Sequence, residues 1–176
     1  MKFYLFVLCF VSVSAHASVN RWSLGHGFES RVQSGINSEQ TENTNLPTFF
    51  GQYRREAWSV TLESGLQPER RTQSGGLSIT SNTWSLGAWA RYEFMQPLRH
   101  SPFLSLGYGR YFDNVQSKFG SAVDERSGQR YFYGLGGGMS HAFWNHFLVE
   151  AELRALVIQN QQDFALAGSL RAGFVF

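Results

Sequence analysis

Cysteine and proline are scarce in this chain of 176 residues, which has one cysteine and four prolines. The cysteine, Cys9, lies in an apolar run near the N-terminus, so no disulfide within the chain compensates for a small core. No apolar run approaches the roughly 20 residues that a membrane-spanning helix requires. The net charge is only +2 and the cations are scattered, which excludes the basic stripe of a nucleic-acid-binding protein.

The first residues have the order of a secretory signal. Lys2 is followed by an apolar run from Phe3 to Val11, and Ala15-His16-Ala17 offers small residues at a cleavage site. The sequence therefore predicts a cleaved signal peptide over residues 1–17 and one exported domain over residues 18–176.

Strict alternation is the strongest pattern that the chain contains. From Phe164 to Phe176 every second residue is apolar, and from Phe147 to Val157 one face is apolar while the other carries three charges. A period of two residues is typical of a strand rather than a helix. The same reading predicts eight strands: Trp22–Arg31, Phe49–Arg55, Trp58–Leu66, Trp84–Met95, Phe103–Phe112, Tyr131–Trp144, Phe147–Val157 and Phe164–Phe176.

The predicted connections alternate between long and short. Long loops are expected over residues 32–47, 67–83 and 113–129, and tight turns at 56–57, 96–102 and 145–146, with one short outer loop near 160–163. Long loops on one rim and turns on the other are typical of an antiparallel outer-membrane β-barrel, rather than a soluble β-sandwich. An even number of strands leaves both termini in the periplasm.

Aromatic residues cluster at the predicted strand ends, as the two interfaces of a membrane favour. The expected periplasmic girdle is Trp22, Trp58, Phe94, Phe103, Phe143, Phe147, Phe174 and Phe176. The expected outer girdle is Trp84, Phe112, Tyr131, Tyr133 and Phe164. These rings favour an all-β, eight-stranded, up-and-down transmembrane barrel in the bacterial outer membrane.

The ending Leu170-Arg171-Ala172-Gly173-Phe174-Val175-Phe176 resembles the last strand of small OmpA/OmpX-type barrels, and the likeness extends over residues 18–176. In that family the ending is read by the barrel-assembly machinery after delivery by periplasmic chaperones. The resemblance thus implies that Phe174 and Phe176 form an assembly signal. It also implies a monomer whose neighbours are outer-membrane lipids and lipopolysaccharide.

Charged residues of both signs lie at alternate positions on the predicted strands, on the face opposite to the apolar residues. This face would line the lumen. An eight-stranded barrel has room inside only for side chains, so these groups must pair. The predicted inward charges are Arg21, Glu29, Arg54, Glu63, Arg91, Glu93, Arg130, Glu150, Glu152, Arg154 and Arg171. We expect a structural plug of ion pairs, and a narrow ion path remains the alternative.

Glycines remove side chains from one predicted wall of the lumen, at Gly107, Gly109, Gly134, Gly136 and Gly138. We expect Trp89, Tyr111 and Phe132 to fill this space. A small-ligand pocket is the alternative.

A lipid A modifying enzyme is the main rival function, because some small barrels deacylate or acylate lipid A. The deacylase pattern has His and Ser two apart with Glu on the next strand, whereas Ser140 and His141 are adjacent and face opposite sides. His26 is expected on the lipid face, opposite the outward residues Gly51, Tyr53, Gly168 and Leu170, none of which is an acid. The sequence therefore favours a non-enzyme without a cofactor.

No metal site is predicted either, since His100 and His146 are expected on separate periplasmic turns. The outer loops are polar and solvated, so a structural or surface-interaction role is the preferred function.

Overall fold

The computed structural model describes residues 20–34, 41–74, 76–94, 100–143, 146–159 and 164–176. The predicted signal peptide, residues 1–17, lies outside these ranges. Among the described residues no helix is long and apolar enough to cross a membrane.

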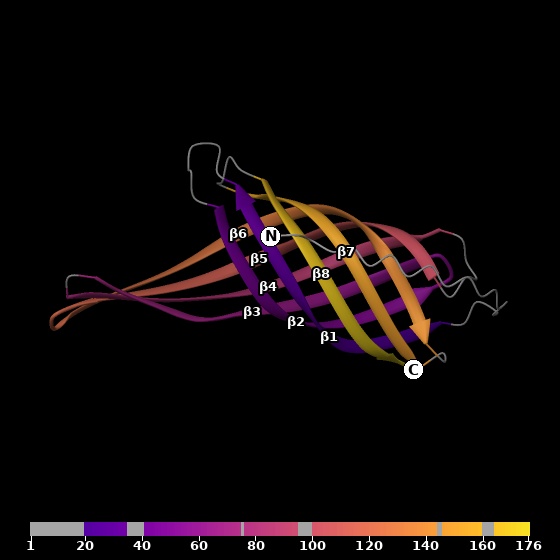
Figure 1. Cartoon of the computed structure of the whole chain (residues 1–176), viewed down its shortest axis with the longest axis horizontal. Coiled ribbons are helices and arrows are strands. Elements are labelled where there is room, and N and C mark those ends of the chain that lie inside the picture. The colour runs from indigo at the N-terminus through magenta and orange to yellow at the C-terminus, as the bar shows by residue number, and fades with distance from the viewer. Residues whose placement is uncertain (1–19, 35–40, 75, 95–99, 144–145, 160–163) are drawn as a thin grey trace, which may run out of the picture.

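Eight antiparallel strands close into one barrel, in which each strand pairs with its neighbours in sequence and β1 pairs with β8 (Figure 1). The strands are β1 (Arg21–Ser34), β2 (Thr41–Arg55), β3 (Trp58–Ser74), β4 (Leu77–Glu93), β5 (His100–Phe119), β6 (Ala122–Phe143), β7 (Phe147–Ile158) and β8 (Phe164–Val175). The predicted fold class and number of strands are confirmed.

The barrel wall has an apolar outside and a polar inside. The exposed large side chains include Leu24, Phe28, Phe49, Val60, Leu62, Leu86, Leu104, Leu106, Leu135, Leu153, Val157, Leu166 and Leu170. Buried inward positions on the same strands hold Glu63, Arg91, Glu150, Arg154 and Arg171. This is the inverse of a soluble protein and the arrangement of a barrel that spans a lipid bilayer.

Two of the predicted long loops are instead long hairpins, which corrects the expected connections. β3 and β4 stay paired to Ser74 and Leu77, and β5 and β6 to Phe119 and Ala122. Gly76 and Gly120, which both have positive φ, lie in the tight turns that close them. These segments are mostly polar, and their few large apolar residues, such as Ile79, Val115 and Val123, do not form a regular apolar face, so the alternation that identifies a half-buried strand is missing from their sequence.

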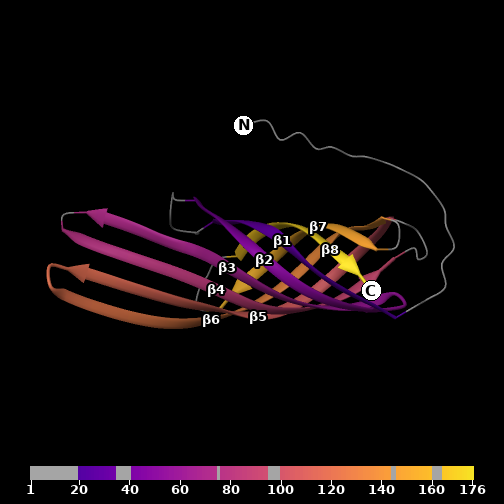
Figure 2. The same cartoon turned by 90° about the horizontal axis from the view of Figure 1, so that it is seen from below.

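Strands β3 to β6 therefore continue as a four-stranded sheet beyond the rest of the barrel, as Figure 2 shows from the side. We call this extension, residues 66–74, 77–84, 112–119 and 122–131, the projecting sheet. The first predicted loop is also shorter than expected, because β2 already begins at Thr41. The short loop near 160–163 lies outside the described residues.

The periplasmic turns are close to the prediction. Glu56, with a φ of 55°, and Ala57 form the turn between β2 and β3, whereas β5 begins at His100, inside the predicted turn 96–102. Phe103 is a further correction, because its side chain is buried in the lumen and not in the girdle. Gly138 lies opposite Phe103 on β6, so the lumen has room for the ring, and the guanidinium of Arg91 covers it at 3.5 Å.

Candidate functional site: the charged lumen and the projecting sheet

The structure joins most of the predicted inward charges in one ion-pair network of Glu29, Glu63, Arg91, Glu150, Glu152, Arg154 and Arg171. Arg54 with Glu93, and Arg130 with Asp113, form separate pairs. Seven of the eight central residues are buried: Glu63, Arg91, Glu93, Glu150, Glu152, Arg154 and Arg171. The eighth, Arg54, is partly exposed at the rim, where it pairs with Glu93. They alternate along β2, β3, β4, β7 and β8 with outward apolar residues, because successive side chains of a strand point to opposite faces.

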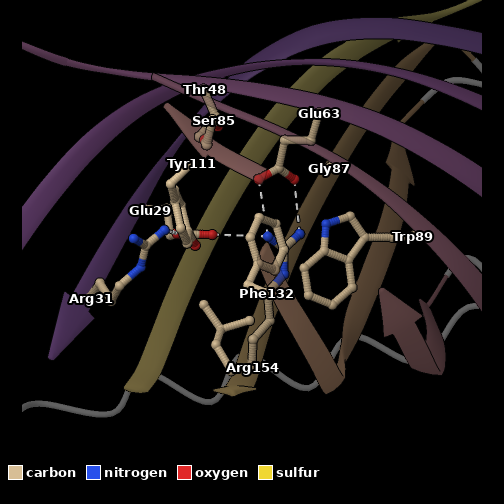
Figure 3. A pocket seen from close by; sticks show the side chains of 11 residues that line it. Glu29, Arg31, Thr48, Glu63, Ser85, Gly87, Trp89, Tyr111, Phe132 and Arg154 are labelled. Carbon is tan, nitrogen blue, oxygen red and sulfur yellow. Dashed lines mark hydrogen bonds and ion pairs between the residues drawn. The ribbon is translucent and has the colours of Figure 1, made fainter. Parts of the chain in front are cut away.

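Arg154 on β7 lies near the middle of the network. Its two Nη atoms donate to both oxygens of Glu63 at 2.8 and 2.9 Å, and also to Glu29 and Glu152 at 2.9 Å each. Figure 3 shows its paired contacts with Glu63, which reach across the barrel from β7 to β3. Such a two-pronged arginine–carboxylate pair fixes both geometry and charge.

Arg171 and Arg91 extend the network toward the end of the barrel where the termini lie. Arg171 pairs with Glu63 at 2.8 Å and with Glu150 at 3.4 Å, and it also contacts Glu152. Arg91 pairs with Glu150 at 2.6 Å. Since the side chains of Arg91, Arg171 and Glu150 are fully buried, each charge depends on these partners for its solvation.

The sequence reasoning missed three inward residues: Arg31 and Gln52 join the network, and Asp113 forms its separate pair with Arg130. Arg31 pairs with Glu29 at 2.5 Å, and Asp113 accepts hydrogen bonds from Arg130 at 2.7 and 2.9 Å. Gln52 donates to Glu150 at 3.5 Å. The parity of Arg31, two residues after Glu29, was the signal that could have identified it. Arg21 is half-buried near the start of β1.

An apolar cluster fills the lumen on the side of the projecting sheet. It consists of Trp89, Tyr111, Phe132, Leu156, Ile158, Ala165 and Ala167. A Cβ at Gly107 or Gly134 would overlap the Trp89 ring, and a Cβ at Gly109 would overlap Phe132, so the glycines make room for these rings as expected. The remaining cavity beside Glu29, Arg31 and Arg154 is about 10 Å³, room for about one water molecule.

His26 lies exposed on the lipid face of β1, as predicted. Its neighbours differ from the prediction: the register places Phe49 on β2 and Ala172 on β8 directly opposite, instead of Gly51, Tyr53, Gly168 and Leu170. The prediction failed because strand register cannot be read from alternation alone. Neither neighbour is an acid or a hydroxyl nucleophile.

His100 is a second correction, because it belongs to β5 and not to a turn. It lies directly opposite His141 on β6, and the two Nδ1 atoms are 3.0 Å apart. No group of three or more His, Cys, Asp or Glu side chains that could hold a metal ion occurs among the described residues.

No protein-family model matches the sequence, and a search of curated proteins gives no match. Solved structures do match over nearly the whole chain. The attachment invasion locus protein Ail of Yersinia pestis is 17% identical, with a TM-score of 0.60 over 89% of this chain and 99% of Ail. Neisserial surface protein A is 16% identical, with a TM-score of 0.59 over 88% and 95%. A major outer membrane protein of Thermus thermophilus is 11% identical, with a TM-score of 0.62 over 90% and 100%.

At these identities the matches establish the fold. The chain is a small eight-stranded barrel of the outer-membrane type, and its apolar outer wall agrees with that location.

Proposed function

We propose that this barrel is a surface-interaction protein of the bacterial outer membrane, in which the plugged barrel is the anchor and the projecting sheet binds a protein partner. The free edge of β6 is the observation that carries the proposal. An extended segment of the partner would add to this edge as a further strand, with main-chain hydrogen bonds supplying much of the affinity.

The edge of β6 is long and regular. Residues 122–131 pair with β5 on one side without any shift in register, whereas pairing with β7 begins only at Phe132 and Ile158. No other described strand pairs with residues 122–130, and all of them except Arg130 are exposed. Unpaired N–H and C=O groups in such a row are a template for another strand.

The opposite edge of the projecting sheet is protected. Beyond Gly65, β3 has no described partner on its outer side, but its register shifts between Gln67 and Arg70. Pro68 lies within this shift and has no N–H to donate. Because bulges and prolines are the usual means by which proteins block edge pairing, the asymmetry favours β6 as the binding edge.

The charges of the projecting sheet favour a protein over a polyanion. Its charged residues are Glu69, Arg70, Arg71, Asp113, Lys118, Asp124, Glu125, Arg126 and Arg130. Three of the five cations are neutralised in ion pairs, Arg71 with Glu69, Arg126 with Asp124 and Arg130 with Asp113. Ail has been solved with the heparin analogue sucrose octasulfate, but here little free positive charge is left for such a ligand.

The lumen supports the role of an anchor. The apolar cluster around Trp89 and Phe132 lies across the path that ions would follow, and the charges beneath it neutralise one another. His26, which lies exposed on the lipid face, has Phe49 and Ala172 directly opposite it, and neither is a nucleophile. We therefore favour an anchor over a narrow pore or a lipid A modifying enzyme.

Lipid and assembly partners complete the proposal. Lipopolysaccharide would surround the outer girdle, where Trp84 stacks on Phe112 at 3.9 Å and Tyr108 packs near Tyr131 and Tyr133. The barrel-assembly machinery and periplasmic chaperones would act during biogenesis through Phe174 and Phe176.

A shortened hairpin tests the proposed binding edge. Replacing residues 115–126 by Asn-Gly joins the directly paired residues Asn114 and Ser127 through a two-residue turn and removes most of the edge. Photo-crosslinking from Ser127 on the edge, compared with Asn114 on the central strand β5, would identify the partner in intact cells. Crosslinks from Ser127 that exceed those from Asn114, together with normal insertion of the shortened chain, are expected. Equal crosslinking from both positions would contradict strand addition at β6.

A further inference from the structure

Two imidazoles face each other at the periplasmic end of β5 and β6. His100 and His141 are directly opposite in the register, their Nδ1 atoms are 3.0 Å apart, and their rings lie 4.2 Å apart between centroids at an angle of 28°. Directly opposed positions of an antiparallel pair hold side chains close together without bending the backbone.

The pair belongs to the outer face of the barrel wall. Ser101 and Ser140, the next residues along each strand, are buried on the inward side, so the histidines point outward. Both are half-buried, and the ring of Phe143 packs edge-on against His141 at 4.0 Å. Because Phe143 belongs to the periplasmic girdle, the pair lies at the membrane boundary and within reach of ions in the periplasm.

The separation of the two nitrogens matches the bite of a metal ion. Imidazole nitrogens bind zinc at about 2.0–2.1 Å, so two nitrogens on one ion lie about 2.8–3.4 Å apart for angles between square-planar and tetrahedral. We propose that His100 and His141 bind one late first-row transition-metal ion, of the class of Cu²⁺, Ni²⁺ and Zn²⁺, through their Nδ1 atoms. Because the rings are stacked at 28°, they must rotate about their Cβ–Cγ bonds, which are soft torsions, before both lone pairs point at the ion.

The surroundings of His100 leave its Nδ1 available. Its Nε2 is buried and has no hydrogen-bond partner among the described residues, so no polar group there fixes the ring in another orientation. A neutral imidazole also has only one proton, so the contact between the two Nδ1 atoms requires one ring to donate and the other to accept. A metal ion replaces that single proton and uses both lone pairs.

The chemistry of the pair sets its selectivity. Two nitrogen ligands, with no group of three or more His, Cys, Asp or Glu among the described residues, favour Cu²⁺ over Ni²⁺ and Zn²⁺, in the usual order of affinities, and do not suit Mg²⁺ or Ca²⁺, which prefer oxygen. Binding requires neutral imidazoles, so acidification weakens it.

Titration of the purified, tag-free barrel in detergent with CuCl₂ tests the site. Calorimetry should give one ion per chain, and His100→Ala or His141→Phe should each weaken binding by about tenfold or more, because each removes a ligand. His141→Phe keeps a ring against Phe143, so the girdle contact survives. His26→Ala and His146→Ala, which change the two other histidines among the described residues, should bind Cu²⁺ as the unaltered chain does.

A spectroscopic measurement on the unaltered chain makes the test independent of variant folding. Paramagnetic Cu²⁺ should broaden the amide signals of residues 100–101 and 140–142 before those of the lumen residues. Binding that both pair variants retain, or broadening centred on His26 or His146, would overturn the proposal.

Discussion

The guanidinium of Arg154 on β7 lies 4.0 Å from the ring centroid of Trp89 on β4, and this contact joins the two halves of the lumen. On one side of it Arg154 bonds to Glu29, Glu63 and Glu152. On the other side Trp89 packs near Phe132 in the apolar cluster, with ring centroids 6.3 Å apart. Indole is the aromatic ring that attracts a cation most strongly, so the apolar cluster also helps to solvate the charge beneath it.

Removing Arg154 should therefore destabilise the barrel strongly. Arg154→Leu leaves Glu152 and Glu63 with fewer cations in a buried site, and we expect a loss of about 3 kcal/mol in the free energy of unfolding. Leu153→Met, at the adjacent residue on the lipid face, should change it by less than about 1 kcal/mol. Urea unfolding in detergent micelles, followed by tryptophan fluorescence, measures both. Equal midpoints for the two variants would show that the network contributes little to stability.

The glycines of β5 and β6 should differ sharply in their tolerance of a methyl group. A Cβ at Gly107 would overlap the Trp89 ring, whereas a Cβ at Gly128 in the projecting sheet would have nothing within 4 Å. Gly107→Ala should cost about 1–3 kcal/mol through overpacking, and Gly128→Ala should be neutral or slightly stabilising. Thermal unfolding of the two variants under identical detergent conditions compares them. An unchanged unfolding temperature for Gly107→Ala would mean that the Trp89 ring has room to move and that the lumen is less tightly packed than the contacts of Gly107 indicate.

The alternation of apolar and polar residues predicted the barrel, because a strand with lipid on only one of its faces needs an apolar side chain at every second residue. β7 and β8 show this best, since lipid on one side and paired charges on the other leave no ambiguity. The charge network followed from the same parity together with the narrow lumen. Its pairings did not: Arg154 contacts Glu63 across the barrel, 91 residues away in sequence, and only strand tilt and register decide that contact.

The projecting sheet was missed for the complementary reason. Thr72, Gln73 and Ser74 pair with Ile79, Ser78 and Leu77, in that order, outside the lipid layer, where no buried face imposes a regular alternation of apolar and polar residues. The pairing of His100 with His141 was missed because the predicted turn 96–102 made β5 begin at Phe103 and placed His100 outside the strand. The position of Phe103 was also predicted wrongly, because an aromatic residue at the end of a strand suits the girdle and the lumen equally well.

The role of Phe176 in assembly can be separated from its role in closing the barrel. Its backbone N–H donates to the Trp22 carbonyl at 2.8 Å, and the Trp22 N–H donates to its carbonyl at 3.3 Å, so deletion removes both closing bonds as well as the ring. Phe176→Ala keeps the backbone and removes only the ring of this residue, which is 73% exposed. If the ring is the assembly signal, both changes should slow insertion and raise periplasmic degradation, and both should exceed the effect of Phe164→Ala at the other end of β8. Pulse-labelled cells at low expression give the rate of appearance of the heat-modifiable folded form. Normal insertion of Phe176→Ala would show that the backbone, not the ring, is what assembly requires.

The lipid A profile decides between the proposed surface role and its enzymatic rival. A histidine-dependent acyl hydrolase or transferase loses about 10² to 10⁴ in rate when its base is removed, so a real activity would be visible in the acyl chains of lipid A. His26 faces lipid opposite Phe49 and Ala172, and His141 contacts His100 on the face of β6 opposite to Ser140, so the pairings within the described residues give no support to a serine–histidine–acid arrangement at either. We therefore expect cells that overproduce the chain, or its His26→Ala, His141→Ala double variant, to have the same acyl-chain count as cells that lack it. Mass spectrometry of purified lipid A, with outer-membrane yield matched between strains, makes the comparison. A changed count with the unaltered chain that the double variant abolishes would refute the surface role as the primary function and make His26 the first residue to study.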